Sequence, residues 1–252
     1  MRRISIVNQK GGVGKTTTAI NLSAALAVAE KHVLLVDADA QTNATSGLGI
    51  DSRELELSTY EVLNEPGRVR EAIRPTAVKF LDIIPASLDL AGLEIELVDT
   101  EMRASRLREA VAPLDSQYDY IIMDAPPSLG LLTVNALVAA EGVLIPVQCE
   151  YYSLEGIGKL MDTLNRVRFS LNPGLEIFGV LLTMYDVRTN LSEQVAEEVR
   201  KYFQDKVFDT VIPRNVRLAE APSFGQTILH YDINSRGAQA YLELASEVIG
   251  RG

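Results

Sequence analysis

The sequence is poor in the residues that build cross-links and metal clusters. Its 252 residues include a single cysteine, Cys149. One thiol per chain excludes an intrachain disulfide framework, and it excludes zinc or iron–sulfur sites built on cysteine pairs. This usage is typical of proteins from a reducing cytoplasm, and we interpret Cys149 as a small buried hydrophobic residue.

Long apolar runs and excess positive charge are missing as well. No stretch approaches the roughly 20 apolar residues that span a bilayer. Met1-Arg2-Arg3-Ile4 passes directly into an apolar segment, which leaves no room for a signal peptide. The net charge of −10 disfavours general attraction to nucleic acid, so any DNA contact requires a local basic patch. We therefore expect a cytoplasmic protein without membrane attachment.

What is present has the composition of a globular protein, with 47% apolar and 23% charged residues. Unbroken apolar runs such as HVLLVDAD at 32–39 and YDYIIMD at 118–124 are typical of strands buried on both faces of a parallel sheet. Such runs alternate with segments of helical periodicity. The alternation predicts a single α/β domain over residues 1–252, with a doubly wound, mostly parallel sheet flanked by helices on both faces.

The pattern also places the individual elements. The expected strands cover residues 4–7, 32–39, 80–85, 118–124, 143–147, 177–183 and 207–212. The expected helices cover residues 17–30, 59–63 (capped by Ser58), 88–98, 105–111, 131–140, 154–169, 190–203 and 236–249, and residues 40–50 are expected to form a loop. In sheets of this kind, ligands bind at the carboxyl ends of the strands.

The most informative stretch is the loop QKGGVGKTT at residues 9–17, which joins the strand at 4–7 to the helix at 17–30. Its three glycines let successive backbone N–H groups converge on phosphate oxygens. The helix behind the loop adds its positive end and its unpaired N–H groups. Lys15 supplies a positive charge for the outer phosphates, and Thr16 supplies a hydroxyl for Mg²⁺.

This loop departs in one place from the common form G-x-x-x-x-G-K-[ST]. Gln9 stands where the first glycine is expected, and a second lysine, Lys10, follows it. The simpler interpretation is a glycine-rich turn without a ligand. The Lys15-Thr16 pair in a strand–loop–helix context favours nucleotide binding.

Three aspartates close apolar strands and are expected at the same edge of the sheet as the loop. Asp124 occupies the usual setting of the second nucleotide-binding motif, where it can hold Mg²⁺ together with Thr16, directly or through water. Asp37 and Asp39 lie on alternate faces of one strand end, so that one can support the metal shell while the other orients the attacking water. A solvated strand-end carboxylate is the alternative for either one alone.

Five segments extend this interpretation: KGGVGKTT, VDADAQTNATSGLG, YDYIIMDAPPS, PVQCEYYSLEG, and TMYDVRTNL followed by IPRNVRLAEAPSFG. In order and spacing they resemble the ParA/Soj type of chromosome-partition ATPase over nearly the whole chain. The resemblance implies a P-loop NTPase of the deviant Walker A (MinD/ParA) type, with ATP and Mg²⁺ as cofactors. It also implies a homodimer with sandwiched ATP, in which Lys10 reaches the nucleotide of the other subunit and behaves like an arginine finger.

The resemblance implies a role for each matching residue. Lys10, Lys15 and Asp39 would act in catalysis, with Asp39 positioning the attacking water. Thr16, Asp39 and Asp124 would hold Mg²⁺. Segments 38–49 and 124–130 would be the two switches that sense the terminal phosphate. The residues implied to contact ATP, including those of the adenine pocket beside Thr183, are Lys10, Gly11, Gly12, Val13, Gly14, Lys15, Thr16, Thr17, Met184, Pro213 and Asn215.

The first switch departs from the family pattern. The family usually reads D-P-Q-G-N-A-T where this chain has DAQTNAT at residues 39–45. Ala40 leaves φ free where proline would fix it, and Thr42 does not take a positive φ as easily as glycine does. We therefore expect this departure to affect the geometry of the first switch, and with it the rate of hydrolysis.

The resemblance further implies ATP-dependent, sequence-nonspecific binding of double-stranded DNA by the dimer. Arg188 and Arg217 are the residues carried over, with Arg214 as a third contact and Arg200 and Lys201 as neighbours. Contacts from arginine to phosphate give nonspecific, salt-dependent affinity, and a dimer doubles their number. The protein would then associate with the nucleoid and be released when a ParB/Spo0J-type centromere-binding partner stimulates hydrolysis. Solvated arginines without a ligand are the alternative.

Two alternatives come from other functional classes. A MinD-like membrane-cycling positioning ATPase would carry a basic amphipathic C-terminal helix, whereas this sequence ends in the acidic stretch YLELASEVIGRG. A P-loop small-molecule kinase or ligase would use the same loop to phosphorylate a metabolite. One cysteine is too few for an iron–sulfur carrier, and no helix-turn-helix segment precedes the loop, so operator binding is not expected.

Overall fold

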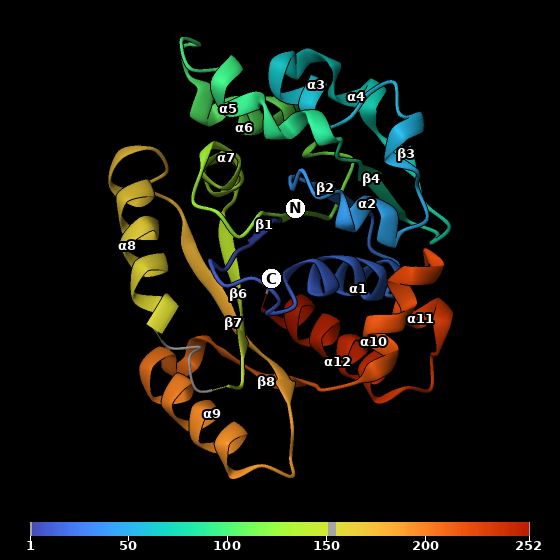
Figure 1. Cartoon of the computed structure of the whole chain (residues 1–252), viewed down its shortest axis with the longest axis vertical. Coiled ribbons are helices and arrows are strands. Elements are labelled where there is room, and N and C mark those ends of the chain that lie inside the picture. The colour runs from blue at the N-terminus through green and yellow to red at the C-terminus, as the bar shows by residue number, and fades with distance from the viewer. Residues whose placement is uncertain (1, 151–154, 252) are drawn as a thin grey trace.

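An eight-stranded β-sheet runs through the centre of the molecule (Figure 1). The computed structural model describes residues 2–150 and 155–251, without the side chains of Glu94 and Glu155. The strands are β1 (Arg2–Ile6), β2 (Val33–Asp37), β3 (Arg74–Pro75), β4 (Leu81–Ile84), β5 (Tyr120–Asp124), β6 (Gly142–Gln148), β7 (Glu176–Tyr185) and β8 (Val207–Pro213).

The strands lie in the order β3-β4-β2-β5-β1-β6-β7-β8, and every neighbouring pair is parallel except β3 with β4. This confirms the predicted doubly wound, mostly parallel sheet. The order reverses around β1, because the chain moves from β1 to one side of the sheet and later returns to the other. The carboxyl ends of β1, β2 and β5 therefore meet at the point where nucleotides bind in such sheets.

Helices cover both faces of the sheet (Figure 1). Helices α1, α10, α11 and α12 lie on one face, and α7, α8 and α9 lie on the other. The helices are α1 (Lys15–Val28), α2 (Asn43–Gly47), α3 (Thr59–Asn64), α4 (Val69–Ala72), α5 (Leu93–Glu96), α6 (Arg106–Val111), α7 (Leu131–Ala139), α8 (Glu155–Ser170), α9 (Asn190–Phe203), α10 (Val216–Glu220), α11 (Ile228–Tyr231) and α12 (Arg236–Gly250).

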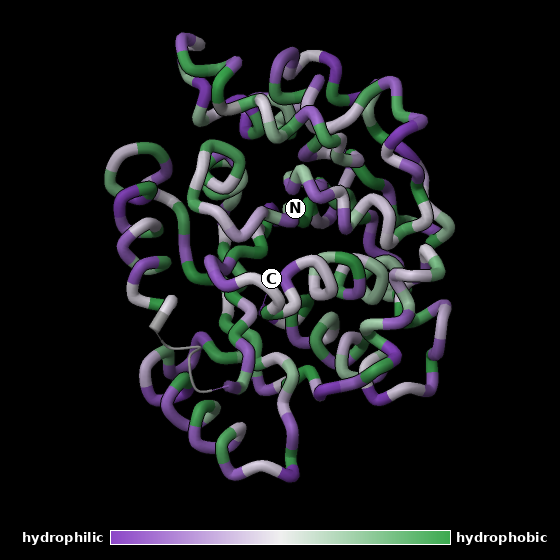
Figure 2. The backbone as a smooth tube through the Cα atoms, viewed as in Figure 1, coloured by the Kyte–Doolittle hydropathy of each residue, from purple (hydrophilic) through white to green (hydrophobic). Residues whose placement is uncertain are grey.

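The sheet separates two apolar cores, and strand alternation assigns residues to them. Along β2, Val33 and Leu35 belong to the core shared with α1 and α12, whereas Leu34 and Val36 belong to the core under α3, α6 and α7. Figure 2 shows hydrophobic residues along the strands and the inner helix faces, and hydrophilic residues on the outer turns. Burial on both faces explains why these strands read as unbroken apolar runs.

Helix α1 is buried nearly all round, and its small residues make that possible. Its sequence, KTTTAINLSAALAV, has buried residues from Thr18 through Ala27 without a gap. Alanine and serine let α12 approach α1 closely, and the Thr18 hydroxyl lies 3.1 Å from the hydroxyl of the buried Tyr241 on α12. A fully packed helix gives the loop before it a rigid support.

The structure corrects several predicted boundaries. Residues 40–50 are not all loop, because α2 forms within them; NATSG is a poor helix sequence, and tertiary hydrogen bonds to Thr45 compensate for it. The single helix expected at 88–98 is instead a 3₁₀ turn, Leu88–Ala91, followed by α5, and Gly92 marks the break. The short elements β3, α4, α10 and α11 were not predicted.

Most other predicted elements are confirmed to within a few residues, including the Ser58 cap. Ser58 and Glu61 form a capping box at the start of α3. Helix α8 is described from Glu155, so the predicted start at Leu154 lies outside the described residues. Within the described residues, none of the helices combines the length and the apolar character that a bilayer crossing requires.

The β7–β8 side of the sheet depends on a glycine. A Cβ atom at Gly179 would lie 2.3 Å from Cε2 of Phe208. The Phe208 ring is fully buried, meets Phe178 edge to face at 6.0 Å, and carries the Arg251 guanidinium 4.1 Å from its centroid. The ring therefore has no free volume into which to move.

We expect Gly179→Ala to lower the free energy of unfolding by about 1–3 kcal/mol, because the added methyl overpacks this core. The control is Gly156→Ala in α8, where no atom of the described residues lies within 4 Å of the added Cβ. There we expect a gain of up to about 1 kcal/mol, because alanine favours the helix. Urea unfolding of both variants measures the difference, and a loss of stability at both positions would contradict this account of Gly179.

Candidate functional site

The loop between β1 and α1 has the backbone that its glycines predict. Gly12 and Gly14 have φ values of 74° and 91°, in the left-handed region that glycine adopts without strain. Gly14 is the N-cap of α1, and its carbonyl accepts the first helical bond from Thr18 N–H at 2.9 Å. The N-terminus of a 14-residue buried helix therefore points into the loop, as anion binding requires.

Hydrogen bonds to two neighbouring strands, β6 and β7, fix this loop. The Asn8 amide donates to the Pro146 carbonyl on β6 at 2.7 Å, and Asn8 Oδ1 accepts from Lys10 N–H at 3.0 Å. On the other side, Thr183 Oγ1 of β7 donates to the Val13 carbonyl at 2.8 Å. Asn8 and Thr183 are both buried. The loop is thus held in shape by the protein itself.

Lys15 lies inside the site, and its side chain is only 8% exposed. Its ammonium donates to the Lys10 carbonyl at 3.2 Å. Burial lowers the pKa of Lys15, and the carboxylates of Asp124 and Asp39 oppose that shift. Lys15 is therefore positioned between the loop and the acidic strand ends.

Asp37 and Asp124 are register partners at the ends of adjacent strands β2 and β5, and both are fully buried. The Asp37 carboxylate accepts from Thr45 N–H at 2.8 Å, from Thr45 Oγ1 at 2.7 Å and from Asp39 N–H at 3.1 Å. Burial raises the pKa of Asp37 to about 6 despite these donors. A carboxyl of this kind binds its proton more tightly in the folded state, so its contribution to stability falls as pH rises from 3.8 through about 6.

Asp124 is in a different situation, since both of its carboxylate oxygens are buried and have no hydrogen-bond partner among the described residues. Burial, and next the negative charge of Asp37, raise the pKa of Asp124 well above its usual range. The Thr16 hydroxyl lies close enough to oppose this rise but makes no hydrogen bond of good geometry with the carboxylate. A buried carboxylate without a partner is costly, and it marks a place for a cation.

These residues fit Mg²⁺ bound together with a nucleotide. Mg²⁺ prefers oxygen ligands, and it takes one or two from the protein and the rest from phosphate and water. Asp124 and Thr16 supply such oxygens beside the loop. In the part of the chain that the structure describes, no three His, Cys, Asp or Glu side chains gather into a metal-binding group, so an all-protein cage of that kind is not formed there.

A cavity of about 330 Å³ opens beside the loop, on the side away from the aspartates. Its wall combines the loop and the start of α1 with the ends of β7 and β8 and with α10. It is lined by Gly14, Thr17, Thr183, Met184, Ile212, Pro213, Arg214, Asn215, Val216, Leu218, Ala219 and Tyr241. The structure thus brings Met184, Pro213 and Asn215, predicted to surround adenine, into one mostly apolar pocket next to the phosphate loop.

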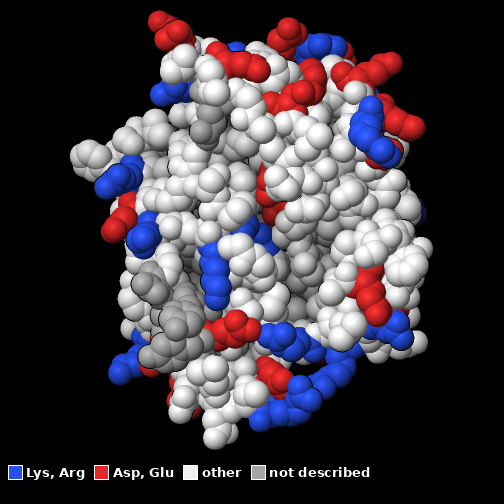
Figure 3. Space-filling view, in the orientation of Figure 1, with Lys and Arg blue, Asp and Glu red and all other residues white. Residues whose placement is uncertain are grey.

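The three predicted DNA contacts are surface arginines, and each is paired with a carboxylate. Arg188 pairs with Asp186 at 2.7 Å, Arg214 with Glu150 at 2.8 Å, and Arg217 with Glu220 at 3.0 Å. Hydrogen bonds from Arg188 lower the pKa of Asp186. Figure 3 shows basic side chains gathered along the lower edge of this face, among acidic ones.

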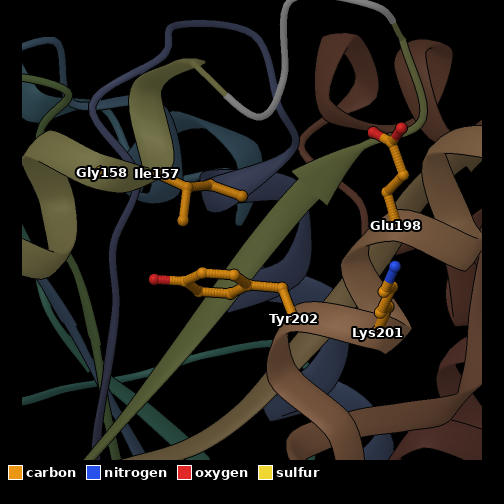
Figure 4. A pocket seen from close by; sticks show the side chains of 5 residues that line it. All are labelled: Ile157, Gly158, Glu198, Lys201 and Tyr202. Carbon is orange, nitrogen blue, oxygen red and sulfur yellow. The ribbon is translucent and has the colours of Figure 1, made fainter.

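A second cavity, of about 560 Å³, separates α8 from α9 (Figure 4). Ile157 and Tyr202 face each other across it, and Glu198 and Lys201 stand at its rim on α9. Among the described residues, none of the phosphate site lines this cavity, and its apolar walls there lack the converging polar groups that would fix a small polar ligand.

Comparison with known proteins identifies the family to which a chain with this site belongs. A family model described as "AAA domain" matches residues 1–177. The sporulation initiation inhibitor protein Soj of Bacillus subtilis is 59% identical over 249 residues, which is 99% of this chain and 98% of that protein. The chromosome partitioning protein ParA of Myxococcus xanthus is 55% identical over 99% of this chain and 88% of its own length. The chain belongs to the ParA/Soj family of chromosome-partitioning ATPases.

Among solved structures, a protein from Mycobacterium smegmatis named cobyrinic acid a,c-diamide synthase, with a bound ATP analogue and magnesium, is 37% identical. It superposes with a TM-score of 0.87 and covers 99% of this chain and 94% of its own. The P-loop ATPase fold of the ParA/Soj family therefore extends over the whole described chain.

For a member of this family, Thr42 is the unusual residue of the first switch. It adopts φ 53° and ψ 27° as the N-cap of α2, the left-handed conformation that the family's glycine would take freely. The departure at Thr42 therefore keeps the left-handed turn, although threonine takes a positive φ less easily than glycine does. Ser46 N–H and Ser46 Oγ both donate to the Thr42 carbonyl, and Thr42 N–H donates to the Asp39 carbonyl at 2.9 Å. These bonds hold the strained residue in place.

Asp39 itself is 8% exposed, and its Oδ1 accepts from Gln41 N–H at 3.0 Å. Asp39 thus lies near Lys15, at the start of the segment that the resemblance implies to be the first switch. Sequence reasoning missed the residues that hold this ParA/Soj site from behind. Asn8, Thr45 and Tyr241 carry no local signal for these roles, because each has a partner at a distant place in the fold: Pro146 for Asn8, Asp37 for Thr45 and Thr18 for Tyr241.

We expect Asp124→Asn to stabilise the nucleotide-free protein at neutral pH by about 1–3 kcal/mol, because it removes a buried carboxylate whose desolvation the nearby Lys15 offsets only in part. The gain is expected to shrink on acidification, since the wild-type carboxyl then takes up a proton. Thermal unfolding in EDTA across a pH series checks both points, with the exposed Asp209→Asn as control. A loss of stability at neutral pH would contradict this prediction, because it would show that the folded protein stabilises the Asp124 carboxylate.

We expect Thr42→Gly to preserve stability or raise it by up to about 1 kcal/mol, because a left-handed β-branched residue is strained. The control is Thr163→Gly in α8, which is expected to lose stability because glycine disfavours helix. Urea unfolding of the nucleotide-free variants compares them. Equal losses at the two positions would mean that Thr42 is not strained.

Proposed function

We propose that this chain is a DNA-segregation ATPase that uses ATP and Mg²⁺ to cycle between a DNA-bound dimer and a free form. One observation carries the proposal. Among the described residues, the buried Asp124 carboxylate has no hydrogen-bond partner, and it lies near the buried Lys15 at the base of a glycine loop anchored to β6 and β7. An arrangement of this kind is costly for the nucleotide-free protein, and a cation with a polyphosphate offsets that cost.

The residues of the site divide the work of phosphoryl transfer to water. The loop from Gly11 to Gly14 would bind phosphate oxygens through its N–H groups, and Lys15 would neutralise their charge. Thr16 and Asp124 would hold Mg²⁺, which when bound spreads the negative charge of the phosphates. Asp39 would orient the attacking water at the entrance of the first switch.

Lys10 supports a shared site. Its backbone is fixed by Asn8 and by the ammonium of Lys15, while its side chain stands half-buried at the edge of the loop. A lysine in this place can deliver a second cation to a nucleotide bound by a facing subunit, as an arginine finger does. ATP would then close two subunits face to face, and hydrolysis would release them.

The surface arginines support the DNA part of the proposal. Arg188 and Arg214 lie just beyond β7 and β8, and Arg217 lies on α10 above the pocket predicted for adenine. In a dimer each contributes twice, and exposed ion pairs with carboxylates are weak enough for DNA phosphates to replace them. A ParB/Spo0J-type centromere-binding protein is the proposed activator of hydrolysis, and the nucleoid is the proposed location.

The C-terminal helix favours this function over a MinD-like membrane cycle. The apolar face of α12 is already buried against α1 and β8, through residues such as Tyr241, Leu244 and Val248. It is not available as a membrane-binding face. A metabolite kinase or ligase with the same loop is the other alternative, and it would require an acceptor for ATP turnover.

The deciding experiment measures binding to arbitrary duplex DNA with ATP, with ADP and with Lys10→Ala in ATP, over a salt series. We expect salt-dependent binding only with ATP and intact Lys10, because only this combination forms the dimer. Liposome sedimentation and acceptor-free ATP turnover run in parallel. Equal DNA binding in all three conditions would refute the nucleotide-gated dimer, and pelleting with liposomes would favour the membrane cycle.

We expect the double variant Arg188→Ala/Arg217→Ala to bind DNA at least about tenfold more weakly and to show a smaller salt dependence, because phosphate contacts are lost. Arg53→Ala is a matched control. Arg53 pairs with Asp51 two residues earlier at 2.6 Å, in the same geometry as Arg188 with Asp186. If Arg53→Ala weakened binding as much as the double variant, the effect would reflect net charge alone.

A further inference from the structure

Thr45 links three parts of the site that are far apart in sequence. It lies on α2 inside the first switch and is fully buried. Its hydroxyl donates to Asp37 Oδ2 at 2.7 Å and accepts from Ala86 N–H, beyond the end of β4, at 2.9 Å. Its own N–H donates to the same Asp37 oxygen at 2.8 Å. A single side chain thus joins the switch helix, the end of β2 and the exit of β4.

The Asp37 carboxylate depends on this link. It has two donors from Thr45 and one from Asp39 N–H. Asp37 is also the register partner of Asp124, whose carboxylate has no hydrogen-bond partner within residues 2–150 and 155–251. The orientation of Asp37 relative to the proposed metal position is therefore set from the direction of α2.

A second buried threonine shows how specific the arrangement is. Thr59, the first residue of α3, donates its hydroxyl to the Asp37 backbone carbonyl at 2.7 Å. It holds the strand end without touching the carboxylate. Thr45 and Thr59 thus bind the same aspartate from two sides. Of these two threonines, only Thr45 donates to the Asp37 carboxylate.

We propose that Thr45 is a positioning residue for the metal site, which orients the Asp37 carboxylate so that it supports the water shell of Mg²⁺ at Asp124. The inference rests on the proposed function, because it takes Mg²⁺ with ATP as the ligand. It adds a consequence for the first switch. Helix α2 cannot shift without removing two of the three donors of Asp37, so the position of α2 and the affinity for Mg²⁺ are coupled.

Thr45→Val keeps the shape of the side chain and the N–H donor but removes the hydroxyl. We expect the Mg²⁺ concentration for half-maximal binding of a fluorescent ATP analogue to rise about tenfold, as is usual when a group behind a metal ligand is lost. Nucleotide binding in EDTA is expected to stay unchanged. In ATP turnover, the half-saturating Mg²⁺ concentration should rise more than kcat falls. Thr45→Ser restores the hydroxyl and should return all values close to wild type.

Thr59→Val is the matched control, because it removes a buried hydroxyl bond to the same residue but leaves the carboxylate donors in place. It should lose comparable stability without moving the Mg²⁺ midpoint. Amide exchange in the nucleotide-free protein adds a readout independent of ligand, since the Ala86 N–H should exchange faster in Thr45→Val than in Thr59→Val. If Thr45→Val does not fold, Thr45→Cys, a weak donor of similar size, should shift the midpoint in the same direction.

The outcomes separate the inference from the proposed function. An unchanged Mg²⁺ midpoint in Thr45→Val, or an equal shift in Thr59→Val, overturns the role of Thr45. If wild-type protein shows no Mg²⁺-dependent ATP binding at all, the proposed function itself fails. DNA binding is not part of these measurements, so a failure on the DNA side leaves the result for Thr45 intact.

Discussion

The burial of two carboxylates at the adjacent ends of β2 and β5 constrains the rest of the structure. Asp37 and Asp124 are fully buried register partners, and only Asp37 has hydrogen-bond donors. Such a pair persists because apolar strands, packed on both faces, hold it in place. The ammonium of Lys15 on α1 partly compensates this negative charge. Helix α1 holds Lys15 in that position because the helix packs against α12. The free energy gained by packing the strands and helices thus compensates for a site that destabilises the folded protein when its ligand is absent.

Much of this arrangement is visible in the sequence, for identifiable reasons. The strands that carry the site are unbroken apolar runs, and the loop is a short motif whose glycines, lysine and threonine each have a local cause. Residues whose role depends on distant partners are invisible to this kind of reasoning. Thr45 reads as one polar residue in a poor helix sequence, and Asn8 as a strand-end amide. Their hydrogen bonds to Asp37 and Pro146 appear only when the chain is folded.

The first switch shows where local preference misleads. Glycine is the easy residue at position 42, and the chain has threonine there in the same left-handed conformation. Hydrogen bonds from Thr42 to Asp39 and from Ser46 to Thr42 fix the backbone of Thr42. The surrounding structure therefore determines this conformation, and the β-branched side chain makes it a strained one. The short helix that follows forms for the same reason. Its stability comes from Thr45 and its contacts rather than from the helix propensity of NATSG.

The end of β7 serves three purposes within four residues. Thr183 holds the phosphate loop, Met184 lines the adjoining cavity, and Asp186 pairs with Arg188 on the surface. Because β7 pairs with β6 and β8 on its two sides, the positions of Thr183 and Met184 are fixed together. A shift at the end of β7 would therefore change the loop anchor and the wall of the cavity together, since one strand carries both.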